Sequence, residues 1–187
     1  KYAELVVPDG VGIKIALKFK GINQEQIRGV DFAKSLIELS AKNSYKLALV
    51  GAKPEINKKL VEVLKGKYPE LNIVYAHDGY FKNDDEIIDD IKKSGANLVF
   101  TALGAPKQEL FNAKLKSITQ GVASIGLGGT FDVLSGSVKL APPIYRKLGL
   151  EWLYRTLKQP ERFKRIFPTL PLFLCHSIMD AVGGKGE

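Results

Sequence analysis

Short apolar runs alternate with segments of helical spacing between Leu5 and about Gly128. The runs are rich in β-branched residues, and the segments between them repeat their apolar positions every three or four residues. This alternation predicts an α/β fold built on a mostly parallel sheet flanked by helices. The predicted strands are 4–7, 46–50, 72–75, 97–102 and 122–126.

Residue types that favour helix ends mark the segments between these runs. Asn83 is predicted to cap a helix whose first turn is acidic, whose last turn is basic and which ends before Gly95. Pro54 and Pro106 stand where a first-turn proline is tolerated, so each is predicted to open a helix. The order of strand, loop and helix is therefore predicted to recur along this region.

The pattern changes after Gly128, where glycine and proline become frequent. From Leu150 onward the chain is rich in arginine and aromatic residues. We therefore predict two domains, an α/β core over 1–140 and a basic, aromatic and helical C-terminal appendage over 141–187.

Composition and charge narrow the possible partners and location. The net charge of +8 predicts an anionic partner, whether a phosphate-bearing substrate, an acidic lipid or a nucleic acid. One cysteine cannot form an internal disulfide, and two histidines with that cysteine are too few for most structural metal sites. No run of about 18 apolar residues predicts a membrane span. We therefore expect a cytoplasmic protein without a bound metal.

Ligands of open parallel sheets bind beyond the carboxyl ends of the strands, so the loops after the predicted strands are the first candidates. Gly104, Gly128 and Gly129 in these loops are candidates for phosphate contact, because glycine lets the backbone approach a phosphate closely. Each loop taken singly is also explained by turn chemistry. Neither a phosphate-binding loop that ends in Gly-Lys-Ser/Thr nor a Gly-x-Gly-x-x-Gly fingerprint is present.

Four polar or aromatic residues in these loops are candidates for substrate contact. Asp9 follows the first apolar run, where it is either a general base or the cap of a helix over 11–20. Tyr80 is a candidate to stack on a flat base, and Asp132 to accept a hydrogen bond from that base. Gln108 is placed to contact phosphate or sugar hydroxyls. Edge packing, helix capping and simple solvation are the alternatives for these last three.

Arg155, Arg162 and Arg165 fall on one side of the appendage if it is helical. Arginine binds phosphate through two parallel hydrogen bonds, and the neighbouring aromatic and leucine residues suit an anionic membrane interface. An ordinary amphipathic helix docked on the core is the alternative.

Four segments in this order resemble the WecG/TagA/CpsF family of glycosyltransferases, and the resemblance covers nearly the whole chain. The segments are Val7-Pro8-Asp9-Gly10, 103–109, 128–132 and 148–155. The resemblance implies a Rossmann-like core and transfer from a UDP-sugar donor to a polyprenyl-diphosphate-linked N-acetylglucosamine, with no metal or other cofactor. It also implies peripheral attachment to an anionic membrane surface at the inner face of the cell membrane.

The same resemblance implies roles for single residues. Asp9 matches a catalytic base, Gln108 a substrate-contacting glutamine, and Tyr80 with Asp132 a uracil site. Arg155, Arg162 and Arg165 match arginines that close over the active site and bind the leaving UDP. Arg28 matches an active-site arginine within a compressed form of the family pattern. Family members usually begin with a further segment carrying Thr-Pro-Asn, so we expect this chain to be the larger part of a longer protein.

The sequence thus predicts an inverting, metal-independent transferase of N-acetylmannosamine or a related sugar in cell-wall or surface-polysaccharide synthesis. A nucleotide-dependent oxidoreductase is disfavoured by the missing glycine fingerprint. A basic nucleic-acid-binding module is the other alternative, although we expect no nucleic-acid partner. The donor sugar is left open, and a homo-oligomer is compatible with the sequence.

Overall fold

The computed structural model describes residues 3–147, 150–158, 169, 171–173 and 175–180. The chain forms two compact units. The sheet unit comprises residues 1–4 and 29–139, and the second unit comprises residues 5–28 and 140–187. These units differ from the predicted domains in placing 5–28 with the C-terminal part, so the predicted boundary at residue 140 stays a prediction.

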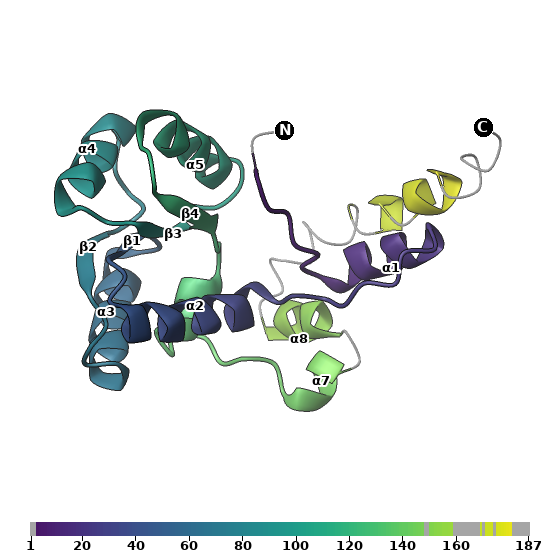
Figure 1. Ribbon diagram of the computed structural model, residues 1–187. Helices are drawn as coiled ribbons and strands as arrows, with labels where there is room; N and C mark the ends of the chain where they lie inside the picture. The colour runs from purple at the N-terminus through teal and green to yellow at the C-terminus, as the bar shows by residue number, and fades with distance from the viewer. Residues whose placement is uncertain (1–2, 148–149, 159–168, 170, 174, 181–187) are drawn as a thin grey trace. The chain divides into compact units, whose positions relative to one another are not determined.

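The sheet unit contains a four-stranded sheet in the order β2-β1-β3-β4, and every neighbouring pair is parallel (Figure 1). Four of the five predicted strands are present, and each predicted start lies within one residue of the observed one. The α/β, Rossmann-like fold is therefore confirmed. The strands are β1 (Leu47–Gly51), β2 (Ile73–His77), β3 (Leu98–Ala102) and β4 (Ala123–Gly126).

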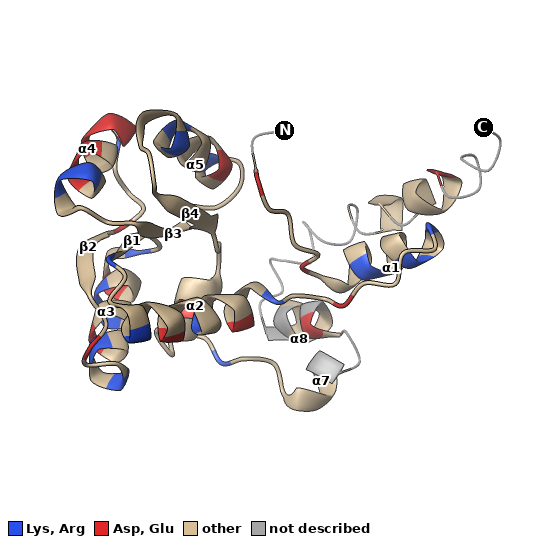
Figure 2. Cartoon of the chain, in the orientation of Figure 1, with Lys and Arg blue, Asp and Glu red and all other residues tan. Residues whose placement is uncertain are grey.

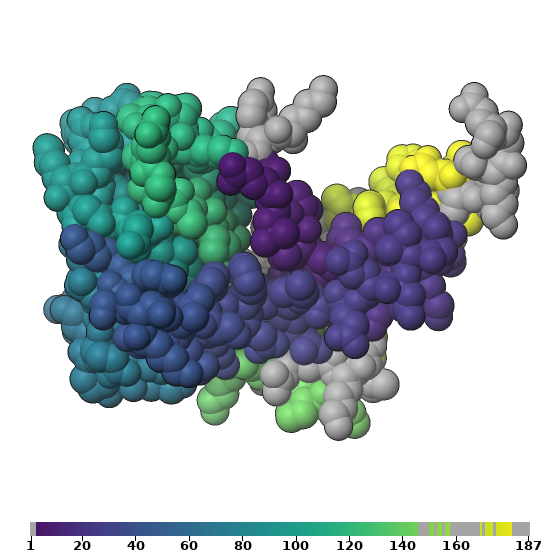
Figure 3. All heavy atoms as spheres, in the orientation of Figure 1, coloured from purple at the N-terminus to yellow at the C-terminus, as the bar shows by residue number. Residues whose placement is uncertain are grey.

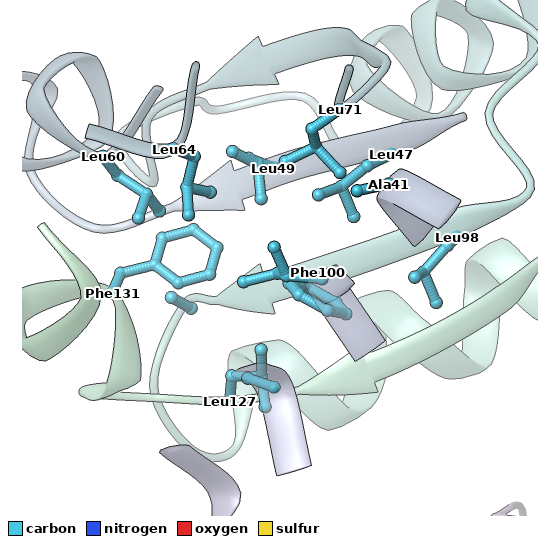
Figure 4. Packing of buried hydrophobic residues seen from close by; sticks show 13 residues of the cluster. Ala41, Leu47, Leu49, Leu60, Leu64, Leu71, Leu98, Phe100, Leu127 and Phe131 are labelled. Atoms are coloured by element: carbon cyan, nitrogen blue, oxygen red, sulfur yellow. The ribbon is translucent and has the colours of Figure 1, made fainter. Parts of the chain in front are cut away.

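Helices cover both faces of this sheet, because successive residues of a strand point to opposite faces. Leu47 and Leu49 of β1 pack into the cluster formed with α2, α3 and α6 (Figure 4), whereas Ala48 and Val50 pack with α4 and α5. All five residues of β1 are buried, as expected for a central parallel strand. The helices are α2 (Gly29–Asn43), α3 (Pro54–Lys67), α4 (Asp84–Ser94), α5 (Lys107–Ile118) and α6 (Thr130–Leu134).

The predicted helix signals agree with these boundaries. Asn83 caps α4 by accepting a hydrogen bond from the Asp85 N–H at 3.0 Å, and Gly95 ends the helix with a left-handed φ of 67°. The acidic first turn and basic last turn of α4 are visible in Figure 2. Pro54 is the first residue of α3, whereas Pro106 precedes α5 as its N-cap.

In the part of the second unit that the structure describes, there are three short helices and further helical residues at 169, 171–173 and 175–180. Helix α1 is visible at the surface in Figure 3. The Ile27 N–H donates to the Pro8 carbonyl at 3.0 Å, and this hydrogen bond closes the segment 8–27 that contains α1. The Tyr145 and Tyr154 rings lie 5.3 Å apart and join α7 to α8. These helices are α1 (Val11–Phe19), α7 (Pro143–Lys147) and α8 (Glu151–Lys158).

The predicted strand over 4–7 was wrong. These residues are neither strand nor helix, and the side chains of Leu5 and Val6 are 71% and 81% exposed. A strand requires a partner for its backbone hydrogen bonds, and among the described residues none pairs with this run. Apolar composition alone therefore does not place a segment in a sheet.

Candidate functional site at the carboxyl edge of the sheet

The carboxyl ends of the four parallel strands meet at one edge of the sheet unit. The crossover from β1 goes to one neighbour, β2, and the crossover from β2 leads to the other neighbour, β3, so the chain reverses direction across the sheet beside β1. Such a switch point is where open α/β sheets bind ligands. The loops at this edge are 52–53, 78–83, 103–106 and 127–129.

The first three loops lie close together because β1 ends in glycine. A Cβ on Gly51 would lie 2.4 Å from the Ala102 carbonyl oxygen, and Gly51 has a φ of 131°, which side-chain-bearing residues rarely adopt. The Ala52 N–H donates to the Ala102 carbonyl and the Gly79 N–H donates to the Ala52 carbonyl, both at 2.8 Å. The end of β3 and the backbones that follow β1 and β2 thus form one connected ledge.

Asn57 of α3 holds this ledge in place through hydrogen bonds to the ends of β1 and β2. The sequence did not predict this role. Its side chain is buried in α3, where its amide donates to the carbonyls of Gly51 at 3.0 Å and His77 at 2.9 Å. The signal in the sequence was a polar residue in the buried stripe of α3, spaced with Leu60 and Leu64. A buried amide needs such partners, because an unpaired one costs free energy.

Gln108 lies in the first turn of α5, as predicted, while its contact with a substrate stays a prediction. Its Oε1 accepts a hydrogen bond from the Gly128 N–H at 3.1 Å, and its Nε2 donates to the Glu109 carboxylate at 3.0 Å. A Cβ on Gly126 would come within 2.7 Å of this amide, so the absent side chain there makes room for it. Gln108 therefore joins the loop after β3 to the glycine-rich turn after β4.

Gly104, Gly128 and Gly129 lie in those two loops, as predicted. Gly104 and Gly128 have φ values of 76° and 49°, and a Cβ on either would meet nothing within 4 Å. The backbone there is open to a ligand and has the conformation that glycine adopts most readily. Whether these glycines bind phosphate stays a prediction.

Tyr80 and Asp132 are both in the sheet unit, where Tyr80 lies in the loop after β2 and Asp132 lies in α6, which packs against α3. The Tyr80 side chain is 69% exposed, while its N–H donates to the Asp78 carboxylate at 2.7 Å. Edge packing therefore does not account for its ring. Asp132 is half-buried in α6, whose N-cap is Gly129, so Asp132 is not the cap of that helix.

Lys107 is a second residue whose role the sequence did not predict. Its Nζ donates to the carbonyls of Gly79 at 3.1 Å and Phe81 at 3.3 Å, and it lies 3.9 Å from the centroid of the Phe81 ring. The lysine was part of the quoted segment 103–109, but only the fold shows that it contacts the loop after β2.

Tyr75 ties β2 to α4 beside this edge. Burial of the phenol, together with the Asp90 carboxylate that accepts its hydrogen bond at 3.4 Å, raises the pKa of Tyr75 to about 12. Tyr75 is thus protonated at neutral pH, and its contact is structural. Its ring stacks 6.3 Å from His77, which leads into the loop carrying Tyr80.

Asp9, Arg28 and Arg155 belong to the second unit. Asp9 is exposed, and the N-cap of α1 is Gly10, so Asp9 does not occupy the capping position that was its alternative. The Arg28 Nε lies 3.7 Å from the Glu151 carboxylate, which ties the segment before α2 to α8. Arg155 lies in α8, while Arg162 and Arg165 lie outside the described residues. Their proposed roles stay predictions.

Four of the five candidate loops therefore share one edge of the sheet unit, and the fifth, with Asp9, is in the other unit. Among the described residues, no group of three or more His, Cys, Asp or Glu side chains is placed to hold a metal ion. In the same part of the chain, no helix has both the length and the apolar character that a membrane crossing requires.

An open parallel sheet flanked by helices on both faces, with glycine-rich turns at its carboxyl edge, defines the class of Rossmann-like α/β proteins. Within that class, the chain belongs to the glycosyl transferase WecG/TagA/CpsF family, whose model matches residues 1–186. The resemblance seen in the sequence is thereby confirmed. Membership disfavours the oxidoreductase and nucleic-acid-binding alternatives.

A similar protein of Bacillus spizizenii is named N-acetylglucosaminyldiphosphoundecaprenol N-acetyl-beta-D-mannosaminyltransferase. The two are 36% identical over 165 residues, which make up 88% of this chain. The matched region spans 64% of the length of that relative.

Proposed function

We propose that the protein, in its full length, transfers N-acetylmannosamine or a closely related sugar from UDP to a polyprenyl-diphosphate-linked N-acetylglucosamine. Family membership and the name of the Bacillus relative support this reaction. The observation in the fold that carries the proposal is the glycine-rich carboxyl edge, where Gln108 and Gly128 meet beside backbone that is open to a ligand.

The donor nucleotide binds at this edge in our proposal. The exposed Tyr80 ring stacks on uracil, and the Asp132 carboxylate accepts a hydrogen bond from the uracil N–H. Backbone N–H groups near Gly104, Gly128 and Gly129 face the diphosphate, because glycine permits close approach. Gln108, already anchored to the turn at Gly128, contacts the sugar.

Chemistry proceeds by one displacement with inversion. The acceptor hydroxyl oxygen forms a bond to the anomeric carbon of the donor sugar, and the bond from that carbon to the UDP oxygen breaks. The hydroxyl proton passes to the Asp9 carboxylate, which acts as the general base. UDP leaves with the bonding electron pair, and arginines such as Arg155 balance its charge without a metal.

Replacing Asp9 by Asn in the full-length protein tests this mechanism. A general base typically contributes about 100-fold to 10,000-fold to the rate, so D9N is expected to lower turnover by that factor. UDP release with a lipid-diphosphate acceptor analogue measures turnover, and UDP binding by calorimetry is expected to stay near that of wild type. Turnover at the wild-type rate would remove Asp9 from the role.

The second unit attaches the protein to an anionic membrane surface in our proposal. The side chains of Leu172, Phe173 and Met179 are 59%, 38% and 68% exposed, and the stretch between α8 and these residues is basic. Such a combination binds acidic lipid interfaces.

Changing Arg155, Arg162 and Arg165 to Glu should reduce sedimentation of the protein with anionic vesicles. Unchanged sedimentation would count against membrane attachment.

A further inference from the structure

Lys107 connects two loops that are not neighbours along the sheet edge. It begins α5 after β3, and its Nζ donates to carbonyls of the loop after β2, although β1 lies between these strands. The side chain is half-buried, and the ammonium lies over the Phe81 ring. An ammonium has only donors, so carbonyl oxygens and an aromatic face are partners that suit it.

The two carbonyls that Lys107 binds stand on either side of Tyr80. One belongs to Gly79 and the other to Phe81. The Tyr80 N–H is held as well, by the Asp78 carboxylate at 2.7 Å. Tyr80 is nevertheless 69% exposed, so an exposed aromatic residue stands on a backbone that is fixed on both sides.

The aromatic group beneath the ammonium is itself anchored. The Phe81 ring lies 5.7 Å from the ring of Phe111, which is fully buried between α5 and the sheet, and 5.8 Å from the ring of His77. Lys107 therefore holds the loop against the core.

Gln108, the residue after Lys107, connects α5 to the turn on the other side, after β4. Gln108 accepts a hydrogen bond from the Gly128 N–H in the turn after β4, while Lys107 reaches the loop after β2. The first turn of α5 is thus tied to the Tyr80 loop and to the glycine-rich turn. These are the two places where the proposed function puts the uracil and the diphosphate.

We propose that Lys107 is a positioning residue that fixes the Tyr80 loop relative to the glycine-rich turn at Gly128, so that one nucleotide-sugar donor contacts both. Lys107 acts through the carbonyls of Gly79 and Phe81, without touching the donor. This inference rests on the proposed function, because it assumes a nucleotide that spans the edge.

Lys107→Met and Lys107→Arg in the full-length protein test this role. Lys114→Met is a matched control, because Lys114 is also on α5 but pairs with the exposed Asp85 at 2.8 Å. Hydrogen exchange of the peptide covering 78–82 is measured by mass spectrometry without nucleotide. K107M is expected to speed exchange at Tyr80 about tenfold or more, because the loop opens locally, whereas K114M is expected to leave it unchanged.

Steady-state kinetics provide the second measurement. K107M is expected to raise the donor KM about tenfold with kcat within about twofold, because a misplaced stacking platform weakens ground-state and transition-state binding equally. K107R is expected to recover part of both effects, since a guanidinium also donates to the two carbonyls.

Unchanged exchange in K107M would overturn the inference. A raised KM without faster exchange would also overturn it, because Lys107 would then act on the donor directly. A wild-type protein that releases no UDP would overturn the proposed function instead. The exchange measurement needs no nucleotide and would still decide whether Lys107 fixes the loop.

Discussion

Asn57 links the carboxyl ends of two neighbouring strands through its side-chain amide. One buried amide group supplies hydrogen bonds to the end of β1 and the end of β2, at Gly51 and His77. These carbonyls belong to the ledge on which the candidate site stands. A polar side chain in a buried helical stripe is retained here because it holds two strand ends at a fixed spacing.

Replacing Asn57 by Ala should lower the free energy of unfolding by about 1–3 kcal/mol, because buried carbonyls lose their donor. The urea midpoint measures this loss. Lys58→Ala, at the next and exposed position of α3, is the control and should stay near wild type. Equal midpoints for the two variants would show that the amide contributes nothing to the ledge.

Residue-level prediction from the sequence was uneven for a physical reason. Asn83 was identified as a cap because capping depends on neighbours within one helical turn. Asn57 and Lys107 were missed because their partners lie in other strands or loops, up to 28 positions away in the case of Lys107 and Gly79. The positions of Gly104 and Gly128 were found, but their ligand contacts stay predictions.

Helix α4 shows how local signals set the boundaries of an element. Its N-cap, acidic first turn and left-handed Gly95 all favour the same ends. Replacing Asn83 by Ala should cost about 1 kcal/mol, because the Asp85 N–H loses its acceptor. The free energy of unfolding from urea titration measures the cost.

Asn83→Ser is the companion variant, because serine retains a capping oxygen. We expect N83S to keep most of the stability that N83A loses. If the two variants unfold at the same urea concentration, the cap does not stabilise α4.

Strands were predicted correctly where the hydrophobic pattern reflects burial. The prediction failed where a strand would need a neighbouring strand to pair with. Strands β1 and β3 are buried on both faces and consist of apolar residues apart from Thr101 in β3, which made them easy to place. The run at 4–7 has similar composition but, within the described chain, no strand beside it. Strand pairing is a long-range property that a short run does not encode.

At the scale of the whole molecule, the division into two units was the least predictable feature. Hydrophobic periodicity describes segments one at a time, whereas the grouping of 5–28 with 140–187 depends on contacts between distant parts of the chain. The Arg28 and Glu151 side chains show such a contact, at 3.7 Å. Four of the five candidate loops thus belong to the sheet unit, and the loop with Asp9 belongs to the second unit.

Two buried clusters found among the described residues lie entirely within residues 29–139. A segment of that size with its own core meets the requirement for independent folding. Produced alone, 29–139 should therefore unfold in one cooperative transition, which far-ultraviolet circular dichroism measures.

If the donor nucleotide binds at the carboxyl edge alone, UDP should raise the melting temperature of this segment, because a ligand that binds the native state stabilises it. A cooperative segment that UDP leaves unchanged would mean that nucleotide binding requires groups of the second unit, such as Arg28 or Arg155.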